Sequence, residues 1–533
     1  MNFLGKEISG KFTVPSGIIT TNLKVAEKLA REIPELGVIT TKSIGPEPKT
    51  GNREPIFHQY APGCFVNAVG LTNPGAEEFA KQLEEIDFPN NKFLLISIFG
   101  KNAEEFAKVA KILEKHADGF ELNFSCPHDK GHGMAIGQDP DTVKEITAAV
   151  KQVTDVPLIP KLTPNTSDIG SIARAAVEGG ASAICAINTV GPGFYSVDGH
   201  PVLTNKIGGI SGSGILPIGL KCVKEIKEAV DVPIIGCGGI TSAQNVTDYE
   251  FAGASIIGIG SALIGLSSNE LKKYFNALDQ DLKKKTNNAG SLLKKINMNF
   301  EKYKLVKNEK LADDLSILVF DKKIDIKPGQ FVFAWIPDVG EKPFSVLNSN
   351  PLTLSIQKVG CFTEKAVELQ EGNEVYFRGP YGNQIEKQDK EIVLVGGGCG
   401  IAALFQIAKE LSNAKAFIGA RDKQHLYYIN EFKEHADVFV STDDGSEGHH
   451  GFVTGLLEKN LEQGKEYVFY NCGPEPMIKA AVEIEKKYAN ETSIFNSIDY
   501  VTKCGVGICG SCATSDGKRA CVDGPFIGVK NEN

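Results

Sequence analysis

The stretch FLLISIFGKNAEEFAKVAKILEKHADGFELNF, residues 93–124, decides the fold class. It begins with an apolar run, continues with apolar residues at every third or fourth position, and ends in a second apolar run. Apolar runs with polar or glycine-rich ends are typical of buried strands, and the 3–4 spacing is typical of a helix. The stretch therefore predicts a strand over 93–99, a helix over 103–116 and a strand over 119–124.

The same alternation extends in both directions, from Lys11 to about Leu266. Strand–helix alternation over some 250 residues is typical of a parallel (β/α)₈ barrel, and an open doubly wound sheet is the alternative. The further strands that we expect are 38–41, 158–162, 183–188, 233–236 and 256–260, and the further helices are 142–153, 169–178 and 218–230.

The composition changes after the barrel, which is expected to occupy residues 1–278. Residues 279–296 are rich in Lys and Asn and are interpreted as a linker with partial helix. Short apolar runs between Gly and Pro over 297–388 indicate a small antiparallel β-barrel. Alternation returns over 389–490 and predicts a nucleotide-binding α/β domain, and residues 491–533 form a cysteine-rich tail domain.

Charge and hydropathy narrow the class of protein. The net charge is −9, from 66 acidic and 57 basic residues, which argues against nucleic acid as a partner. The start, MNFLGKEISGKF, lacks the basic and apolar segments of a leader, and the longest uncharged apolar stretch, 392–408, contains four glycines. We therefore expect a cytoplasmic protein without a membrane partner, whose twelve cysteines are mostly thiols or metal ligands.

Four cysteines gather near the end of the chain, in CGVGICGSC (504–512) and at position 521. Their spacing, C-x4-C-x2-C…C, is that of plant-type [2Fe–2S] proteins. The interleaved glycines allow the backbone to wrap the cluster and donate N–H groups to its sulfides. A zinc site is the alternative, but zinc sites prefer paired C-x2–4-C knuckles. The sequence therefore predicts a cluster on Cys504, Cys509, Cys512 and Cys521.

Polar residues and glycines follow the expected barrel strands. In a parallel barrel these positions form the catalytic face, and the loops after the last two strands bind phosphate. GCGGI (236–240) and GIGSAL (258–263) stand at those two positions, where glycines let backbone N–H groups approach a phosphate closely. Cys126 lies on a glycine-rich loop after the strand that ends near Asn123, which favours a chemical role for this thiol.

The part of the chain after residue 297 resembles the ferredoxin–NADP reductase superfamily. The resemblance rests on KPFS (342–345), GGGCG (396–400) and NCGPEPM (471–477). It implies FAD on the β-barrel and NAD on the α/β domain, with Lys342 where the family usually has Arg. The implied FAD contacts are Lys342, Pro343, Phe344, Ser345, Ile356, Gln357, Lys358, Phe362 and Thr363, and the implied NAD contacts are Gly397, Gly398, Cys472, Gly473 and Pro474.

The barrel resembles class 1 dihydroorotate dehydrogenases. The motifs that carry this resemblance are ELNFSCPHDKGHGMAIGQDP (121–140), NAVGLTNPG (67–75), PKLTPN (160–165), AINTVGPG (186–193), GGISG (208–212) and GCGGI (236–240). The C-terminal half is similar to the electron-transfer subunit of the NAD-dependent, class 1B form, in STDDGSEGHHGFVT (441–454), CGPEPM (472–477) and the four cysteines. The family usually keeps these parts on separate subunits, whereas here they are fused.

This resemblance implies oxidation of dihydroorotate to orotate in de novo pyrimidine (UMP) biosynthesis, with electrons passing from FMN through the [2Fe–2S] cluster and FAD to NAD⁺. It implies a homodimer through the barrel, Cys126 as the base at C5, and Lys161 at the flavin N1–O2 edge, with Lys42 as the third catalytic residue. The implied substrate contacts are Lys42, Asn67, Ala68, Val69, Gly70, Leu71, Asn123, Asn188 and Thr189, and the implied FMN contacts are Ser16, Lys42, Ser43, Asn123, Lys161, Ile187, Gly212, Gly238, Gly239, Gly260 and Ser261.

Two alternatives stay open. Dihydropyrimidine (uracil or thymine) dehydrogenases also show Ser-Cys-Pro-His and Gly-Gln-Asp-Pro, and here His128 stands where dihydroorotate dehydrogenases commonly have Asn. The second alternative is an electron-transfer module that serves a protein partner. Retention of Cys126, Lys42, Lys161 and Asn123 together argues against that module.

Overall fold

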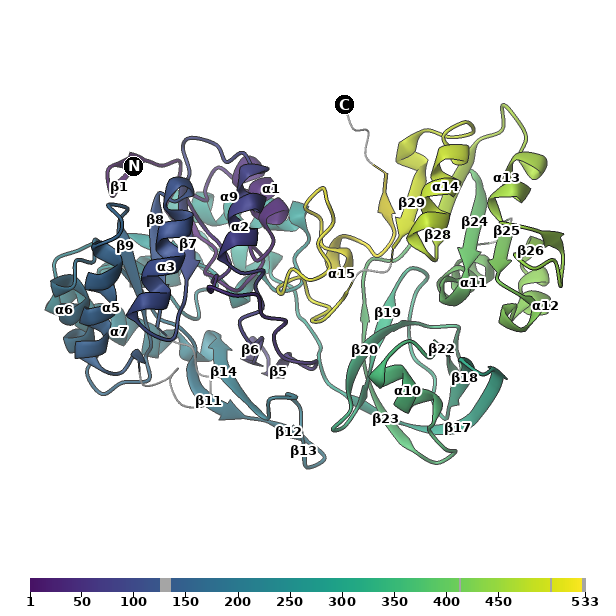
Figure 1. Cartoon of the computed structure of the whole chain (residues 1–533), viewed down its shortest axis with the longest axis horizontal. Helices are drawn as coiled ribbons and strands as arrows, with labels where there is room; N and C mark the ends of the chain where they lie inside the picture. The colour runs from purple at the N-terminus through teal and green to yellow at the C-terminus, as the bar shows by residue number, and fades with distance from the viewer. Residues whose placement is uncertain (125–135, 412–413, 499–500, 530–533) are drawn as a thin grey trace. The chain divides into compact units, whose positions relative to one another are not determined.

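The fold is that of a computed structural model, which describes residues 1–124, 136–411, 414–498 and 501–529. The chain forms two compact units (Figure 1). Unit 1 comprises Met1–Asn297 and Val506–Arg519, and unit 2 comprises Met298–Gly505 and Ala520–Asn533. The cysteine-rich tail therefore contributes residues to both units, and the domain boundaries expected from the sequence stay predictions.

Unit 1 is built on eight parallel strands in the order β3-β16-β15-β10-β9-β8-β7-β4. The two end strands, β3 and β4, lie close to each other. Phe12 forms an isolated β-bridge with Leu36, and the hydroxyls of Thr13 and Thr40 lie 2.8 Å apart. The sheet is thus a nearly closed barrel, as the alternation predicts, and not an open sheet. The strands are β3 (Phe12–Thr13), β4 (Val38–Thr40), β7 (Phe93–Ile98), β8 (Gly119–Asn123), β9 (Leu158–Leu162), β10 (Ile184–Ala186), β15 (Ile234–Cys237) and β16 (Ile256–Gly258).

Helices connect the strands, and several of them begin at polar caps. The Asn102 side chain accepts a hydrogen bond from the N–H of Glu105 at the start of α3, which satisfies one of the free N–H groups of the first turn. The last helix, α9, runs to Lys284 and so includes the first part of the expected linker. The helices are α1 (Leu23–Glu32), α2 (Ala76–Glu84), α3 (Ala103–Leu113), α5 (Pro140–Lys151), α6 (Ile169–Glu178), α7 (Leu216–Ala229), α8 (Ala243–Ala252) and α9 (Ser268–Lys284).

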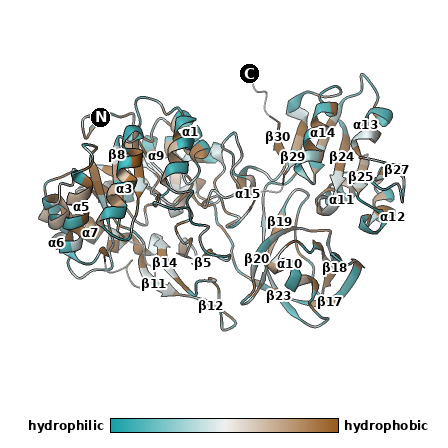
Figure 2. Cartoon of the chain, viewed as in Figure 1, coloured by the Kyte–Doolittle hydropathy of each residue, from teal (hydrophilic) through white to brown (hydrophobic). Residues whose placement is uncertain are grey.

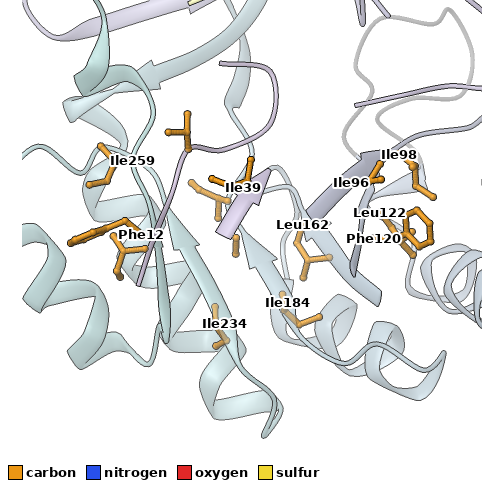
Figure 3. Packing of buried hydrophobic residues seen from close by; sticks show 14 of the residues in the cluster. Phe12, Ile39, Ile96, Ile98, Phe120, Leu122, Leu162, Ile184, Ile234 and Ile259 are labelled. Atoms are coloured by element: carbon orange, nitrogen blue, oxygen red, sulfur yellow. The ribbon is translucent and has the colours of Figure 1, made fainter. Parts of the chain in front are cut away.

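The barrel strands present their two faces to different surroundings, because successive side chains of a strand point to opposite sides. Phe120 and Leu122 of β8 join the large apolar cluster that includes helix residues, together with Ile96 and Ile98 of β7 (Figure 3). Hydrophobic residues colour much of β8, and hydrophilic residues appear on the helices that cover the barrel (Figure 2). Glu121, between Phe120 and Leu122, therefore faces the barrel interior.

A four-stranded antiparallel sheet, β11-β14-β6-β5, accompanies the barrel and was not predicted. Its strand β14 pairs with β6, so that Gly209 faces Asn67 and Gly212 faces Cys64. The sheet brings two segments of the expected substrate and FMN sites together. Its strands are β5 (Phe57–Ala61), β6 (Cys64–Asn67), β11 (Val190–Phe194) and β14 (Ile207–Gly212).

Unit 2 begins with seven antiparallel strands in the order β20-β19-β23-β17-β18-β22-β21, which confirms the expected antiparallel β structure. Trp335 and Phe320 are among its largest buried side chains. The elements are β17 (Glu301–Ala312), β18 (Leu315–Phe320), β19 (Phe331–Ile336), β20 (Gly340–Ser345), β21 (Asn348–Ser349), β22 (Leu352–Gln357), α10 (Cys361–Val367) and β23 (Glu374–Tyr381).

The rest of unit 2 is a mainly parallel sheet in the order β27-β26-β25-β24-β28-β29-β30, with helices on both faces. Ile392 and Leu394 of β24 pack with α11 and α12, whereas Val393 and Val395 pack with α13 and α14. None of the helices in the described part of the chain is both long and apolar enough to cross a membrane. The elements are β24 (Glu391–Gly397), α11 (Ile401–Glu410), β25 (Ala414–Ala420), α12 (Ile429–Lys433), β26 (Ala436–Thr442), β27 (His449–His450), α13 (Thr454–Asn460), β28 (Tyr467–Cys472), α14 (Glu475–Glu485), β29 (Ile494–Ser497) and β30 (Ile527–Gly528).

Candidate functional site

A buried ion pair lies inside the barrel of unit 1. Lys161 Nζ, from β9, is 3.5 Å from Glu121 Oε2, from β8, and both side chains are almost fully buried. Ser16, in the loop after β3, bridges the pair: its Oγ accepts from Lys161 Nζ at 2.9 Å and donates to Glu121 Oε1 at 2.6 Å. The lysine is thus held by a carboxylate and a hydroxyl from two other elements.

A chain of hydrogen bonds leads from Glu121 to the ends of neighbouring strands. Ser97 Oγ donates to Glu121 Oε1 at 2.7 Å and lies 2.8 Å from Ser43 Oγ. Asn123 Nδ2 donates to Ser43 Oγ at 2.9 Å, and Asn188 Nδ2 donates to Asn123 Oδ1 at 3.3 Å. The structure therefore connects five residues of the predicted FMN and substrate sites, namely Ser16, Ser43, Asn123, Lys161 and Asn188.

Glu121 and Ser97, which complete this chain, were absent from the predicted site. A signal for Glu121 was available in the sequence, because a charged residue in the middle of an apolar strand is rarely buried unless it is paired. Ser97 carries a weaker signal, since serines are often hydrogen-bonded within strands without a functional role.

Two buried lysines at this end of the barrel have shifted pKa values in opposite directions. Burial works to lower the pKa of Lys161, but the Glu121 carboxylate, with smaller contributions from Cys185 and Cys237, raises it above its ordinary value. Burial lowers the pKa of Lys42 to about 8, against an opposing effect of Cys509 and with a further lowering by Lys161. Both lysines can supply positive charge near neutral pH.

The end of β14 and the loops after β15 and β16 have the backbone that the predicted FMN phosphate site needs. Gly212, Gly238 and Gly239 have φ values of 104°, 131° and 74°, in the region that favours glycine. A Cβ on Gly239 would lie 2.7 Å from the N of Leu216, so a side chain would displace the backbone there. Gly260 and Ser261 follow β16. These loops fit the close approach of a phosphate to backbone N–H groups.

The predicted substrate segment 67–71 meets the loop after β10. Asn67 Nδ2 donates to the Gly209 carbonyl at 3.2 Å, and a Cβ on Gly209 would collide with the side chain of Thr189. Gly70 and Leu71 both have positive φ values, 82° and 53°. Asn67 and Thr189 are therefore close to the same short segment of β14. Cys126 and His128 lie outside the described residues.

The predicted FAD contacts of unit 2 lie on β20, β22 and α10, and Lys358 directly follows β22. Lys342, Pro343, Phe344 and Ser345 end β20, and the Phe344 and Phe362 rings are 6.0 Å apart between centroids. The Thr363 hydroxyl accepts from the N–H groups of Val359 and Gly360, at 2.9 and 3.1 Å, and so orders the start of α10. The structure therefore brings the Phe344 and Phe362 rings together, and Thr363 bonds the backbone at the start of α10.

The predicted NAD contacts lie at the ends of β24 and β28 and in the two loops that follow these strands, which are here called the loop pair. Strands β24 and β28 are parallel neighbours, and a Cβ on Gly473 would lie 3.0 Å from the Gly397 carbonyl oxygen. Cys399 Sγ is 3.5 Å from Gln357 Oε1, so this loop pair also touches a predicted FAD residue. The arrangement fits transfer between a flavin and a nicotinamide within unit 2.

Arg378, which the sequence did not single out, is a buried charge of unit 2 with several hydrogen-bond partners. Its Nε and Nη2 donate to the two carboxylate oxygens of Glu341 at 2.5 and 2.8 Å. Its Nη1 donates to Tyr381 Oη at 2.9 Å and to the Cys504 carbonyl at 3.2 Å. Burial opposes the charge of Arg378, but Glu341 raises its pKa. The pair therefore orders the backbone at the first predicted cluster cysteine.

The segment Val506–Arg519 is anchored to the barrel of unit 1. The N–H of Ile19 donates to the Ile508 carbonyl at 2.7 Å, and Thr21 Oγ1 donates to the Cys509 carbonyl at 2.9 Å. Arg519 donates to the carbonyls of Gly507 and Leu266, at 2.6 and 2.7 Å.

The backbone around the predicted cluster ligands has the conformation that a wrapped loop requires. Gly505, Gly507 and Gly510 have φ values of 78°, 75° and 72°, which fits a loop whose N–H groups surround a cluster. Cys509 and Cys512 belong to unit 1, and Cys504 and Cys521 belong to unit 2. The four-cysteine ligand set stays a prediction.

Comparison with protein-family models assigns three parts of the chain. Residues 1–286 match the model described as dihydroorotate dehydrogenase, which is more than half of the chain. Residues 394–483 match the oxidoreductase NAD-binding domain. Residues 501–531 match the iron–sulfur cluster binding domain of dihydroorotate dehydrogenase B.

Individual proteins support the first of these matches. The catalytic subunit of dihydroorotate dehydrogenase B (NAD(+)) from Pyrococcus horikoshii is 42% identical over 286 residues, which cover 53% of this chain and 92% of that protein. The corresponding subunit from Methanocaldococcus jannaschii is 40% identical with the same coverage. A chain in the solved structure of an NADH-dependent reduced ferredoxin–NADP oxidoreductase is 30% identical and covers 42% of this chain and 87% of its own, but its TM-score of 0.39 is too low to support an argument.

Proposed function

Because the chain belongs to the dihydroorotate dehydrogenase family, we propose that it oxidises dihydroorotate to orotate with NAD⁺ as the acceptor. The chain joins the parts of an NAD-linked, class 1B-like enzyme: a dihydroorotate dehydrogenase barrel, an oxidoreductase NAD-binding domain and an iron–sulfur binding domain. The observation that carries the proposal is the hydrogen-bonded chain from Lys161 to Asn188, which connects five of the predicted FMN and substrate residues.

The side chains at this end of the barrel suit a dihydropyrimidine that carries a carboxylate. Asn67, Asn123 and Asn188 offer amide donors and acceptors for the ring N–H and C=O groups. Lys42, whose pKa is about 8, is largely protonated at neutral pH and suits the substrate carboxylate. Cys126, outside the described residues, is proposed as the base that removes the proton from C5 of the substrate.

The loops and Lys161 fit FMN. The glycine-rich loops after β15 and β16 would hold its phosphate, and Lys161 would place a positive charge beside the flavin N1–O2 edge. When bound, FMN would accept the hydride from C6, and the cluster and FAD would pass the electrons on to NAD⁺. The chain's own residues supply the binding, the orientation and the charge for these steps.

The order of electron transfer, FMN to [2Fe–2S] to FAD to NAD⁺, is part of the proposal. The match of residues 501–531 to the iron–sulfur domain of the B-type enzyme supports it, as does the contact between Cys399 and Gln357 in unit 2. We also propose a cytoplasmic location and a homodimer through the barrel, on the family resemblance.

The test uses the full-length protein with its cofactors. We expect FMN, FAD, iron and sulfide in the purified chain, and dihydroorotate-dependent reduction of NAD⁺. Cys126→Ala should lower the rate about 10²- to 10⁴-fold, which is the usual contribution of a general base. Cys222→Ala is the matched control, because Cys222 is buried on α7 away from the strand ends.

Two outcomes would change the proposal. Unchanged turnover in Cys126→Ala would remove Cys126 as the base. Oxidation of dihydrouracil but not of dihydroorotate would make the protein a dihydropyrimidine dehydrogenase, in line with His128 after Cys126-Pro127.

A further inference from the structure

Glu121 occupies an unusual position in β8. Its neighbours Phe120 and Leu122 pack in the apolar cluster outside the barrel, and Glu121 points into the barrel with 1% of its surface exposed. A carboxylate in such a place is costly unless its charge and its oxygen atoms are satisfied. The surroundings of Glu121 therefore indicate why a glutamate stands there.

Three elements supply the partners of Glu121. Ser16, from the loop after β3, and Ser97, from β7, both donate to Oε1, at 2.6 and 2.7 Å. Lys161 Nζ, from β9, lies 3.5 Å from Oε2. One carboxylate thus connects four segments of the barrel, and two of its three partners are predicted FMN contacts.

We propose that Glu121 is a positioning residue for the flavin-binding end of the barrel, which holds Lys161 in place and charged and fixes the Ser43–Asn123–Asn188 chain through Ser97. This inference rests on the proposed function, because Lys161 and the two asparagines act there on the flavin and the substrate. Glu121 itself acts through these neighbours, with Ser16 and Ser97 as its contacts.

Lys42 provides an internal comparison for the role of Glu121. Lys42 and Lys161 are both buried at the same end of the barrel, but among the described residues only Lys161 has a carboxylate partner. Burial lowers the pKa of Lys42 to about 8, whereas at Lys161 the effect of burial is outweighed by Glu121. The two lysines therefore differ in their partners, because Glu121 pairs with Lys161 and not with Lys42.

The other titratable groups that face Lys161 do not replace Glu121. They are Lys42, after β4, whose like charge opposes that of Lys161, and the thiols of Cys185 on β10 and Cys237 on β15. Without the carboxylate, burial and Lys42 would both act against the charge of Lys161. Its behaviour should then approach that of Lys42.

The experiment compares wild type, Glu121→Gln and Ser97→Ala as full-length, cofactor-loaded proteins. The glutamine keeps the shape and an acceptor oxygen but removes the charge. Ser97→Ala removes the hydrogen bonds of one hydroxyl to Glu121 and Ser43 but keeps the charge. The midpoint potential of the bound FMN is measured electrochemically from pH 6 to 10. The same titration on protein from which FMN has been released identifies the contribution of FAD.

We expect Glu121→Gln to bind FMN at least tenfold more weakly than wild type at alkaline pH. Its plot of FMN potential against pH should show an added break, because Lys161 without its carboxylate partner loses its proton within the measured range. Wild type and Ser97→Ala should lack this break. Superimposable plots for wild type and Glu121→Gln would overturn the inference.

If Glu121→Gln does not fold, Glu121→Asp decides. Aspartate keeps the charge but moves the carboxylate away from Lys161 by one methylene group. Weaker FMN binding than in wild type supports the inference, and FMN binding equal to that of wild type overturns it. Because the titration needs no substrate, FMN binding without dihydroorotate oxidation overturns only the proposed substrate. Absence of FMN from the wild type overturns both.

Discussion

Each unit buries a glutamate against a cation, but the two pairs are built differently. In unit 1, Lys161 stands 3.5 Å from Glu121, and Ser16 bridges them. In unit 2, Arg378 makes two direct hydrogen bonds to Glu341, at 2.5 and 2.8 Å, and two more to Tyr381 and to the Cys504 carbonyl. The first pair is longer and is bridged by a hydroxyl, whereas the second is joined by two direct hydrogen bonds.

The difference follows from the chemistry of the two cations. A guanidinium matches a carboxylate in two parallel hydrogen bonds, whereas an ammonium is a compact charge with three donors that can turn toward a ligand. Arg378 directs its donors at protein atoms, which suits a structural role. Lys161 is positioned with its charge maintained, which suits a group that acts on a bound flavin.

The largest expected effect is on the stability of unit 2. Arg378→Met removes the cation that makes two hydrogen bonds to the buried Glu341 and should lower the free energy of unfolding by about 3–5 kcal/mol. Urea unfolding of the full-length protein measures the change. The double variant Arg378→Met/Glu341→Met removes both charges and should recover most of the loss, and equal losses in the single and double variants would contradict a structural pair.

The corresponding change in unit 1 should act on catalysis. Lys161→Met removes the charge proposed to stabilise the reduced flavin and should lower the turnover number about 10²- to 10³-fold, the typical cost of losing one electrostatic stabiliser. Dihydroorotate-dependent NAD⁺ reduction measures this effect. A loss of turnover smaller than tenfold would make the two ion pairs alike in role.

A third buried glutamate, Glu485, differs from Glu121 and Glu341 because it accepts a hydrogen bond from an amide and not from a cation. Glu485 of α14 accepts from Asn471 Nδ2 at 2.8 Å, and burial raises its pKa from 4.5 to about 8. Between pH 4.5 and about 8, Glu485 keeps its proton in the folded state but has lost it in the unfolded state. The free energy of unfolding should therefore fall as the pH rises from about 5 to 8. The total loss should be on the order of 3 kcal/mol.

Thermal unfolding as a function of pH measures this loss, and Glu485→Gln is the matched variant because its side chain is neutral throughout. The variant should lack the decline that the wild type shows. Parallel curves would mean that Glu485 is not protonated in the folded protein.

The smallest effect concerns the Ser97 hydroxyl, which is hydrogen-bonded to Glu121 and to Ser43. Ser97→Ala should lower the free energy of unfolding by about 2 kcal/mol, because both hydrogen bonds are lost while Ser16 and Lys161 still satisfy the carboxylate. Denaturant unfolding measures the change. A loss as large as that of Arg378→Met would show that the unit 1 carboxylate depends on one hydroxyl.

Much of the fold could be predicted from local pattern. The strand 158–162 and the helix 169–178 have the expected bounds, because the apolar spacing changes sharply at their ends. Strand β3 was missed because it has only two residues, and the sheet that contains β11 and β14 was missed because its glycine-rich strands lack an alternating pattern. Such strands form only when a neighbouring strand supplies their hydrogen-bond partners.

The sequence by itself determined the barrel, the reductase-like second half and the residue types of the site, because periodicity and motif spacing are local properties. Only the tertiary structure showed that Glu121 pairs with Lys161, and that Arg378 pairs with Glu341 and donates to the Cys504 carbonyl. These pairs join residues that lie from 37 to 126 positions apart. Which charges meet in a protein interior is decided by the packing of whole strands, and that packing has no signature in any short stretch of sequence.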